Sequence, residues 1–74
     1  MISFAEWLEH ARVTDDPEGD LVTDMRTERE LPNFTSFESM HSYVRFKSNG
    51  DRAVLAAVPG VWRRYEAWCR RPQI

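Results

Sequence analysis

This chain has to fold without a covalent or metal staple. Its 74 residues contain one cysteine, so no internal disulfide can form, and no cluster of cysteines and histidines has the spacing of a structural metal site. A chain of this length buries only about 60% of the surface that its unfolded form exposes. The apolar residues, 42% of the sequence, therefore have to supply the stability. We expect a single small domain over residues 1–74, with no cofactor and no metal.

The runs of consecutive apolar residues are too short for a membrane-spanning segment. No stretch approaches the roughly 18 consecutive apolar residues that are typical of a spanning helix. The first residues also lack the cationic segment and the apolar run of a secretory signal peptide. We therefore expect a cytoplasmic protein.

Helix start signals divide the first half of the chain. Ser3 and Glu6 have the spacing of a capping box, and Ile2 and Trp7 have that of a hydrophobic staple. The pattern predicts a first helix over residues 4–12, because the apolar positions that follow keep the helical period.

A second helix is predicted by an aspartate followed by a proline. Asp16 is a favourable N-cap, and Pro17 at the first helical position loses nothing by its missing N–H. We expect this helix over about residues 17–29. Gly19 near its start costs up to about 1 kcal/mol relative to alanine, which indicates that another helix approaches closely there.

A third helix is predicted between a second capping box and a turn. Thr35 and Glu38 form the box, and Asn49-Gly50 ends the helix, since both residues tolerate the left-handed conformation. Asp51 then caps a fourth helix. Pro59 costs about 3 kcal/mol inside a helix.

The chain is therefore expected to break at Pro59, with a fifth helix running from there to Pro72. The apolar phase continues through Pro59, so one kinked helix is the alternative.

The apolar positions of these helices define the expected core, and no segment alternates as a strand does. Cys69 follows the same apolar phase and is expected to be a small core residue. The sequence predicts an all-α fold, a compact bundle of four to five short helices. The expected core is Phe4, Trp7, Leu8, Leu21, Met25, Phe37, Met40, Val44, Leu55, Val58, Trp62 and Tyr65.

Several spacings taken together carry a family resemblance over nearly the whole chain. The most specific is Asp15-Asp16-Pro17-x-Gly19-Asp20-Leu21-x-x-Asp24, and the others are Phe4-x-x-Trp7-Leu8, Pro32, Tyr43, Ala53 and Trp62-x-x-Tyr65. With these residues the chain resembles the YozE SAM-like family of small bacterial proteins. The resemblance implies a fold like that of the sterile alpha motif. It implies no activity, because the function of that family is unknown.

The net charge of −2 conceals a strong asymmetry. Residues 1–30 carry nine acidic residues against three arginines, a net charge of −6, whereas residues 31–74 carry three acidic against seven basic residues, a net charge of +4.

Asp16, Asp20 and Asp24 recur every four residues and share one helix face. A straight row of carboxylates rarely encloses a cation. Beyond the cap Asp16, we expect Asp20 and Asp24 to form a solvated face or a protein contact.

The expected basic site lies at the start of the last helix. Arg63 and Arg64 would stand in its first two turns, where cations are unfavourable unless an anion is bound. Together with the free N–H groups of that helix end they would hold a phosphate or a carboxylate. Arg52 is the third basic residue expected to bind.

The sequence favours binding over catalysis. His10, His41 and Cys69 have no acid–base or nucleophile partner at a recognisable spacing, so we expect no enzyme.

The first expectation is a protein–protein interaction module, including self-association between the acidic second helix and the basic last helix. The alternative is nucleic-acid binding, and a third is a small regulatory or phage-borne protein that blocks a host factor. The nucleic-acid residues would be Arg45, Lys47, Arg52, Arg63 and Arg64.

Overall fold

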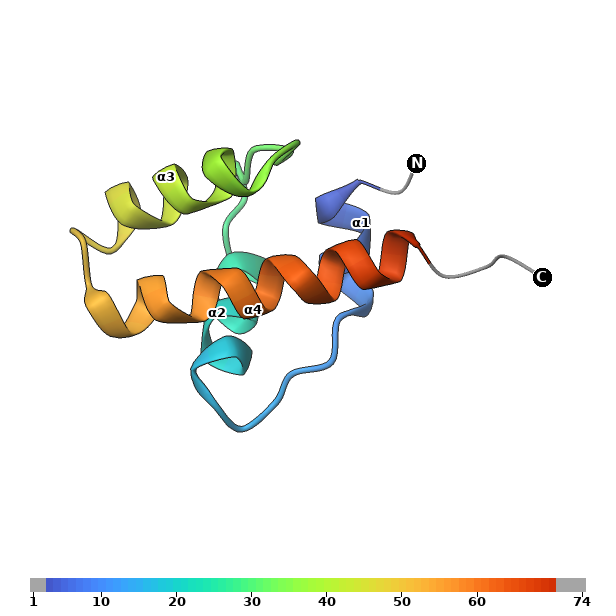
Figure 1. The fold of residues 1–74 in the computed structure, drawn as a ribbon, viewed down its shortest axis with the longest axis horizontal. Coiled ribbons are helices and arrows are strands. Elements are labelled where there is room, and N and C mark those ends of the chain that lie inside the picture. The colour runs from blue at the N-terminus through green and yellow to red at the C-terminus, as the bar shows by residue number, and fades with distance from the viewer. Residues whose placement is uncertain (1–2, 71–74) are drawn as a thin grey trace.

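Helix α4, Arg52–Cys69, is the element on which the other helices pack. The computed structural model describes residues 3–70, and the described chain is all α-helical, with no strand. The preceding helices are α1 (Phe4–His10), α2 (Pro17–Arg26) and α3 (Phe37–Lys47) (Figure 1). The all-α prediction is confirmed.

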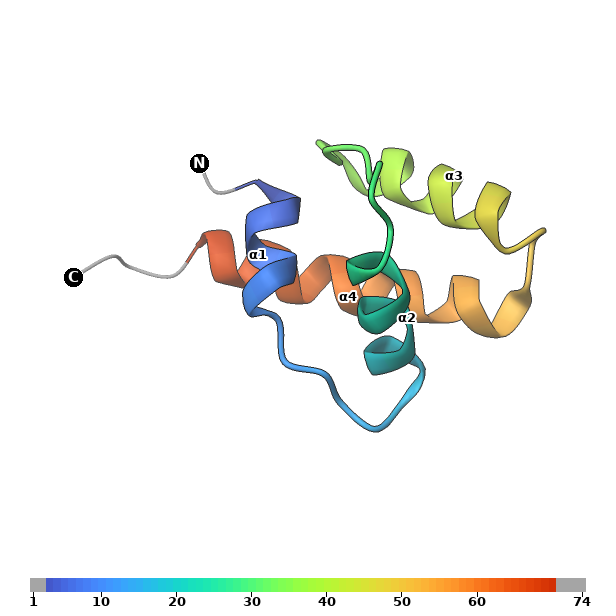
Figure 2. The ribbon, with the colours of Figure 1, turned by 180° about the vertical axis from the view of Figure 1, so that it is seen from behind.

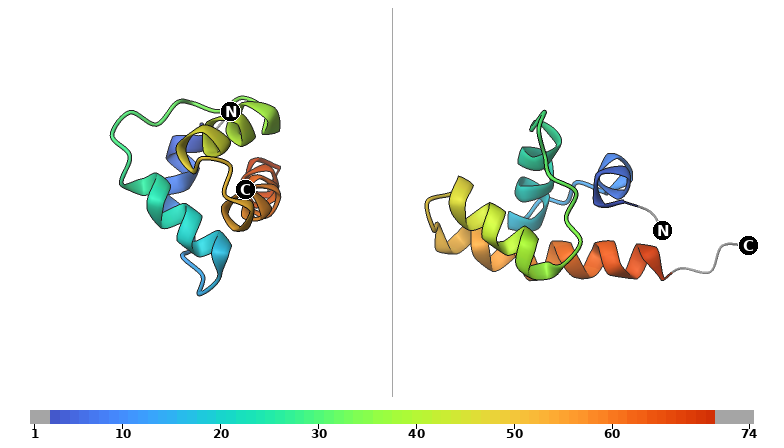
Figure 3. Two further views of the ribbon diagram at one scale, coloured as in Figure 1. Left: turned by 90° about the vertical axis from the view of Figure 1, so that its left-hand side faces the viewer. Right: turned by 90° about the horizontal axis from the view of Figure 1, so that it is seen from above.

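The three shorter helices meet α4 in different ways. Helices α1 and α2 lie on the same side of α4 (Figure 2). Helix α2 crosses α4 steeply, whereas α3 lies along the first half of α4 (Figure 3). Helices α2 and α3 each contact α4 but do not pack directly on one another.

Three predicted caps are confirmed by side-chain hydrogen bonds. The Ser3 hydroxyl accepts from the Glu6 N–H at 3.2 Å, and the Asp16 carboxylate accepts from the Gly19 N–H at 2.8 Å. The Asp51 carboxylate accepts from two N–H groups at the start of α4. Each cap satisfies donors that a helix start otherwise leaves free. The staple residue Ile2 lies outside the described residues.

The start of α3 differs by one residue from the prediction. Ser36, not Thr35, is the N-cap, and its capping box is completed by Ser39 rather than by Glu38. Both pairs have the three-residue spacing, and the serine hydroxyl of Ser39 returns to the cap N–H at 3.2 Å. The helix end is confirmed, because Asn49 and Gly50 both have positive φ, 55° and 75°.

Helices α1 and α2 are shorter than predicted, and the side chain of Arg26 binds backbone carbonyls at the end of α1. Its guanidinium donates from Nε to the Leu8 carbonyl at 2.8 Å and from Nη2 to the carbonyls of Glu9 and Ala11. Helix α1 therefore ends at His10 with its last carbonyls satisfied by a side chain from α2. Helix α2 ends at Arg26, where the Thr27 hydroxyl donates to the carbonyl of the preceding turn.

The predicted break at Pro59 is wrong. Helix α4 runs through Pro59 as one helix, so the described chain contains no fifth helix and the alternative of a single helix is correct. Val58 and Val61 on either side of the proline are fully buried, and Trp62 is nearly so. This burial offsets the lost hydrogen bond. The helix ends at Cys69, and the predicted end signal Pro72 lies outside the described residues.

The two glycines that allow close approach do so at different places. A side chain at Gly19 would collide with the backbone of Thr14, in the loop before α2, so the neighbour is a loop and not the predicted helix. A side chain at Gly60 would meet the carboxylate of Glu18. Gly60 thus lets the start of α2 approach α4.

The core is built around the ring of Phe4, which is fully buried. The ring contacts four other aromatic side chains, with centroid distances of 5.2–6.0 Å. These are Trp7 of α1, Phe34 of the loop that precedes α3, and Trp62 and Tyr65 of α4. Ten of the twelve predicted core residues are buried, while Phe37 and Leu55 are half-buried against them, as is Cys69. The buried hydrophobic residues outside that prediction are Ala11, Val22, Phe34, Ala57 and Val61.

We expect Trp62→Ala to lower the free energy of unfolding by about 3–5 kcal/mol, because the indole stacks on Phe4 and its loss leaves a cavity. The matched control is Phe46→Ala, which removes an aromatic ring that is 80% exposed and should change stability by less than about 0.5 kcal/mol. Urea unfolding followed by circular dichroism measures both. Equal effects of the two substitutions would contradict this core.

Candidate functional site

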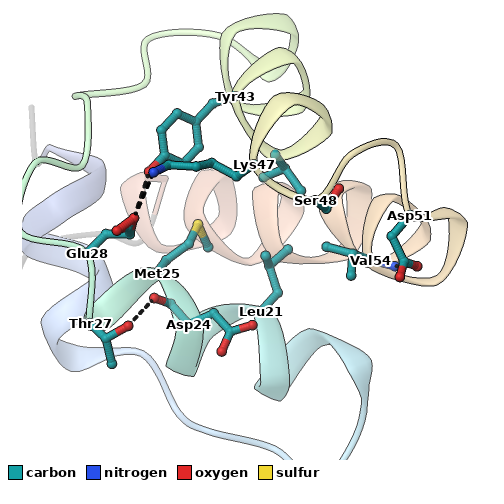
Figure 4. A pocket seen from close by; sticks show the side chains of 11 residues that line it. Leu21, Asp24, Met25, Thr27, Glu28, Tyr43, Lys47, Ser48, Asp51 and Val54 are labelled. Atoms are coloured by element: carbon teal, nitrogen blue, oxygen red, sulfur yellow. Dashed lines mark hydrogen bonds and ion pairs between the residues drawn. The ribbon is translucent and has the colours of Figure 1, made fainter.

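A groove opens between α2 and α3, because both helices pack on α4 and not on each other (Figure 4). Its volume is about 480 Å³. Apolar side chains from all three helices line it: Leu21 and Met25 from α2, Val44 from α3 and Val54 from α4. Since Val54 is only half-buried, part of this apolar lining is open to solvent.

Carboxylates dominate the polar side of the groove. Asp24 on α2 and Asp51 at the start of α4 both line it. Glu28 also lines it and is paired with Lys47 of α3 at 3.3 Å. Asp51 is occupied as a cap, and the carboxylate of Asp24 forms no ion pair within residues 3–70. The groove therefore carries net negative charge, which favours cationic groups.

Two hydroxyl groups on the α3 side of the groove differ in how well they are satisfied. The Tyr43 hydroxyl lies 3.4 Å from the Glu28 carboxylate. Burial and the charge of Glu28 raise the pKa of Tyr43. The Ser48 hydroxyl is buried and has no hydrogen-bond partner among the described residues. A buried hydroxyl without a partner costs the fold part of its stability.

The three aspartates predicted on one face of α2 have separate roles. Asp16 is the cap, and hydrogen bonds from Thr14 and the Gly19 N–H lower the pKa of Asp16. Asp20 is exposed and outside the groove, whereas Asp24 lines it. Within the described chain, no group of three or more His, Cys, Asp or Glu residues is placed to hold a metal ion.

Arg64 is committed to the fold rather than to an open patch. Its guanidinium donates to the Arg12 carbonyl at 2.6 Å, lies 5.9 Å from the centre of the Trp7 ring and is 3.9 Å from the Glu18 carboxylate. It therefore joins α1 and the start of α2 to α4. The adjacent Arg63 is exposed. The two arginines that were predicted to form one binding site therefore lie in different surroundings.

The continuity of α4 also removes the predicted anion site. Arg63 and Arg64 lie in the middle of a helix that begins at Arg52, where the backbone N–H groups are used in the helix itself. Free N–H groups at a helix start cannot assist them there. The helix start that was expected to complete an anion site with Arg63 and Arg64 is therefore absent at this position.

The outer face of α4 instead carries a stripe of arginines. Arg52, Arg63 and Arg70 are exposed and are spaced by eleven and seven residues, which aligns them on one side of a helix. Arg63 and Arg70 donate weakly to backbone carbonyls one turn back, at 3.4 Å. None of the three pairs with a carboxylate in the part of the chain described. The expected break at Pro59 concealed this alignment.

Phe46 is the most exposed large apolar side chain of the described residues, at 80%. It lies on α3 beside Arg45, and the hollow around it is lined by small or polar residues, among them Asn49 and Gly50. It was not among the predicted site residues. Its exposure could have been predicted from the sequence, because Phe46 does not share the helix face of the buried residues Met40 and Val44.

No helix among residues 3–70 is long and apolar enough to cross a membrane. Comparison with known proteins gives no match: no family model matches the chain, and no curated protein and no solved structure is significantly similar to it. The function has therefore to be inferred from the surface of the chain itself.

We expect Arg64→Ala to lower the free energy of unfolding by about 1–2 kcal/mol, because it removes a hydrogen bond and the packing of the guanidinium on Trp7. Arg63→Ala, the same change one residue earlier on the exposed side, should cost less than about 0.5 kcal/mol. Thermal and urea unfolding compare them. A larger loss for Arg63→Ala would show that the two roles are reversed.

Proposed function

We propose that this chain is a non-enzymatic, cytoplasmic protein-interaction module that binds a partner segment in the groove between α2 and α3. The segment would insert an apolar side chain and place a lysine or arginine beside it. The observation that carries the proposal is the groove itself, which combines an apolar lining with the free carboxylate of Asp24.

The two parts of the groove would select different parts of the partner. An aromatic side chain buries on the order of 150–250 Å² when it is enclosed, and Leu21, Met25 and Val54 offer it an apolar wall. A neighbouring cation would lie against Asp24, where complementary charge adds specificity and speeds association.

The likeness to the YozE SAM-like family is part of this proposal. The described residues form a bundle of short helices on a longer C-terminal one, which is compatible with a sterile-alpha-motif-like fold. A fold of this kind carries no activity of its own. The groove and its charges therefore support the interaction function, and the family likeness supports only the architecture.

The proposal is tested by selecting binders from a displayed library of random peptides. We expect the enriched peptides to share an apolar side chain next to Lys or Arg. Asp24→Lys should weaken the best peptide at least ~10-fold at low salt, equivalent to about 1.4 kcal/mol, because it places a like charge in the groove. Isothermal titration measures the affinity.

The control is Asp15→Lys, which makes the same charge change at an exposed position in the loop before α2. This variant should bind the peptide as the unmodified chain does. An absence of enriched peptides, or equal weakening by both variants, would contradict binding in the groove.

A second candidate function is nucleic-acid binding by the outer face of α4. The specific observation is the alignment of Arg52, Arg63 and Arg70, unpaired with carboxylates within residues 3–70. Phosphate neutralisation by such a row would give binding that falls steeply with salt. The net charge of −2 limits it to this one face.

Fluorescence anisotropy with labelled single- and double-stranded DNA and RNA at low salt tests this second candidate. Binding should be lost on Arg63→Glu and kept on Arg29→Glu, an exposed arginine after α2. An affinity that neither substitution changes, or an absence of binding at low salt, would eliminate nucleic acid as a ligand of this face.

A further inference from the structure

Phe46 stands clear of its surroundings as a knob. The ring is 80% exposed, and the residues that share its hollow, Ser42, Asn49 and Gly50, are too small to cover it. Open space surrounds Gly50, where an added side chain would meet no atom within 4 Å. Arg45 adjoins the ring and forms no ion pair in the described chain. The knob therefore consists of an aromatic ring with a free cation beside it.

The knob has the chemistry that the groove would select. An apolar ring matches the lining formed by Leu21, Met25 and Val54, and the free cation of Arg45 matches the free carboxylate of Asp24. The cation that lines the groove itself, Lys47, is already paired with Glu28. A free arginine and a free aspartate on separate surfaces of one chain are complementary between copies.

The knob and the groove lie on opposite sides of α3. Tyr43, Val44, Lys47 and Ser48 line the groove, whereas Ser42, Arg45, Phe46 and Asn49 line the hollow around the knob. At about 100° per residue these two sets are centred half a turn apart. A chain therefore cannot place its own Phe46 in its own groove, and each copy offers one knob and one groove to different neighbours.

We propose that a second copy of this chain occupies the groove, with Phe46 inserted between α2 and α3 and Arg45 against Asp24. This inference rests on the proposed function and names the partner. The contact is heterologous, so it builds a head-to-tail row of copies unless the rotation between neighbours closes a ring. A single knob in a groove buries less than a standard interface, so the association is weak and depends on concentration. It replaces the self-association expected through Arg63 and Arg64, since Arg64 is held within its own chain.

Sedimentation velocity over a wide concentration range at low salt tests the proposal. The average mass of the unmodified chain should rise above that of the monomer as concentration increases. Phe46→Ser removes the knob and leaves the groove, whereas Asp24→Lys spoils the groove and leaves the knob. Each variant alone should need at least ~10-fold higher concentration to associate. Both positions are exposed, and circular dichroism confirms that the variants fold.

Mixing the two variants gives the decisive measurement. Phe46→Ser supplies an intact groove and Asp24→Lys an intact knob, so an equal mixture should form a complex of one copy of each that grows no further. The matched controls are Val13→Ser, at the other exposed large apolar residue among residues 3–70, and Asp15→Lys. Both should associate as the unmodified chain does.

Three outcomes would overturn the proposal: a monomer at every concentration, variants that still associate, or a mixture that stays monomeric. The peptide selection separates these outcomes from failure of the proposed function. If selected peptides bind and lose affinity on Asp24→Lys while the chain stays monomeric, the groove serves a different partner and only the self-association is wrong.

Discussion

The structure depends on the continuity of α4 through Pro59. A proline inside a helix costs about 3 kcal/mol, yet α4 continues because its buried face, including Val58 and Val61, serves α1 and α2 as well as α3. A break at this point would divide the surface on which the three other helices pack. Gly60, directly after the proline, adds the space in which Glu18 of α2 approaches. Tertiary packing therefore prevails over the local preference of one residue.

The same continuity fixes what the arginines of α4 do. Arg63 and Arg64 are neighbours in sequence, but about 100° of rotation per residue directs them to different surroundings. Arg64 reaches the Arg12 carbonyl and the Trp7 ring, whereas Arg63 joins the exposed stripe with Arg52. A pair that reads as one basic patch in sequence thus becomes one structural group and one surface group.

Local signals predicted the helices well, and long-range packing was the part they missed. Asp16 and Asp51 cap their own helices, and Asn49 has the left-handed conformation, because each depends only on residues within one turn. The outcome at Pro59 depends on helices distant in sequence. The groove depends on the space that α2 and α3 leave when both pack on α4, so Asp24 was predicted as a binding residue while its apolar neighbours were assigned only to the core.

The acidic first half and the basic second half of the sequence do not form two opposed faces of the molecule, because α3 carries different free charges beside its two sides. Its groove side carries Lys47, but Glu28 neutralises this lysine and leaves Asp24 as the free charge of the groove. Its outer side carries the free charge of Arg45 beside Phe46. One helix therefore separates the two complementary surfaces by its own thickness. That separation prevents them from meeting within one chain, so the contact that we propose is one between chains.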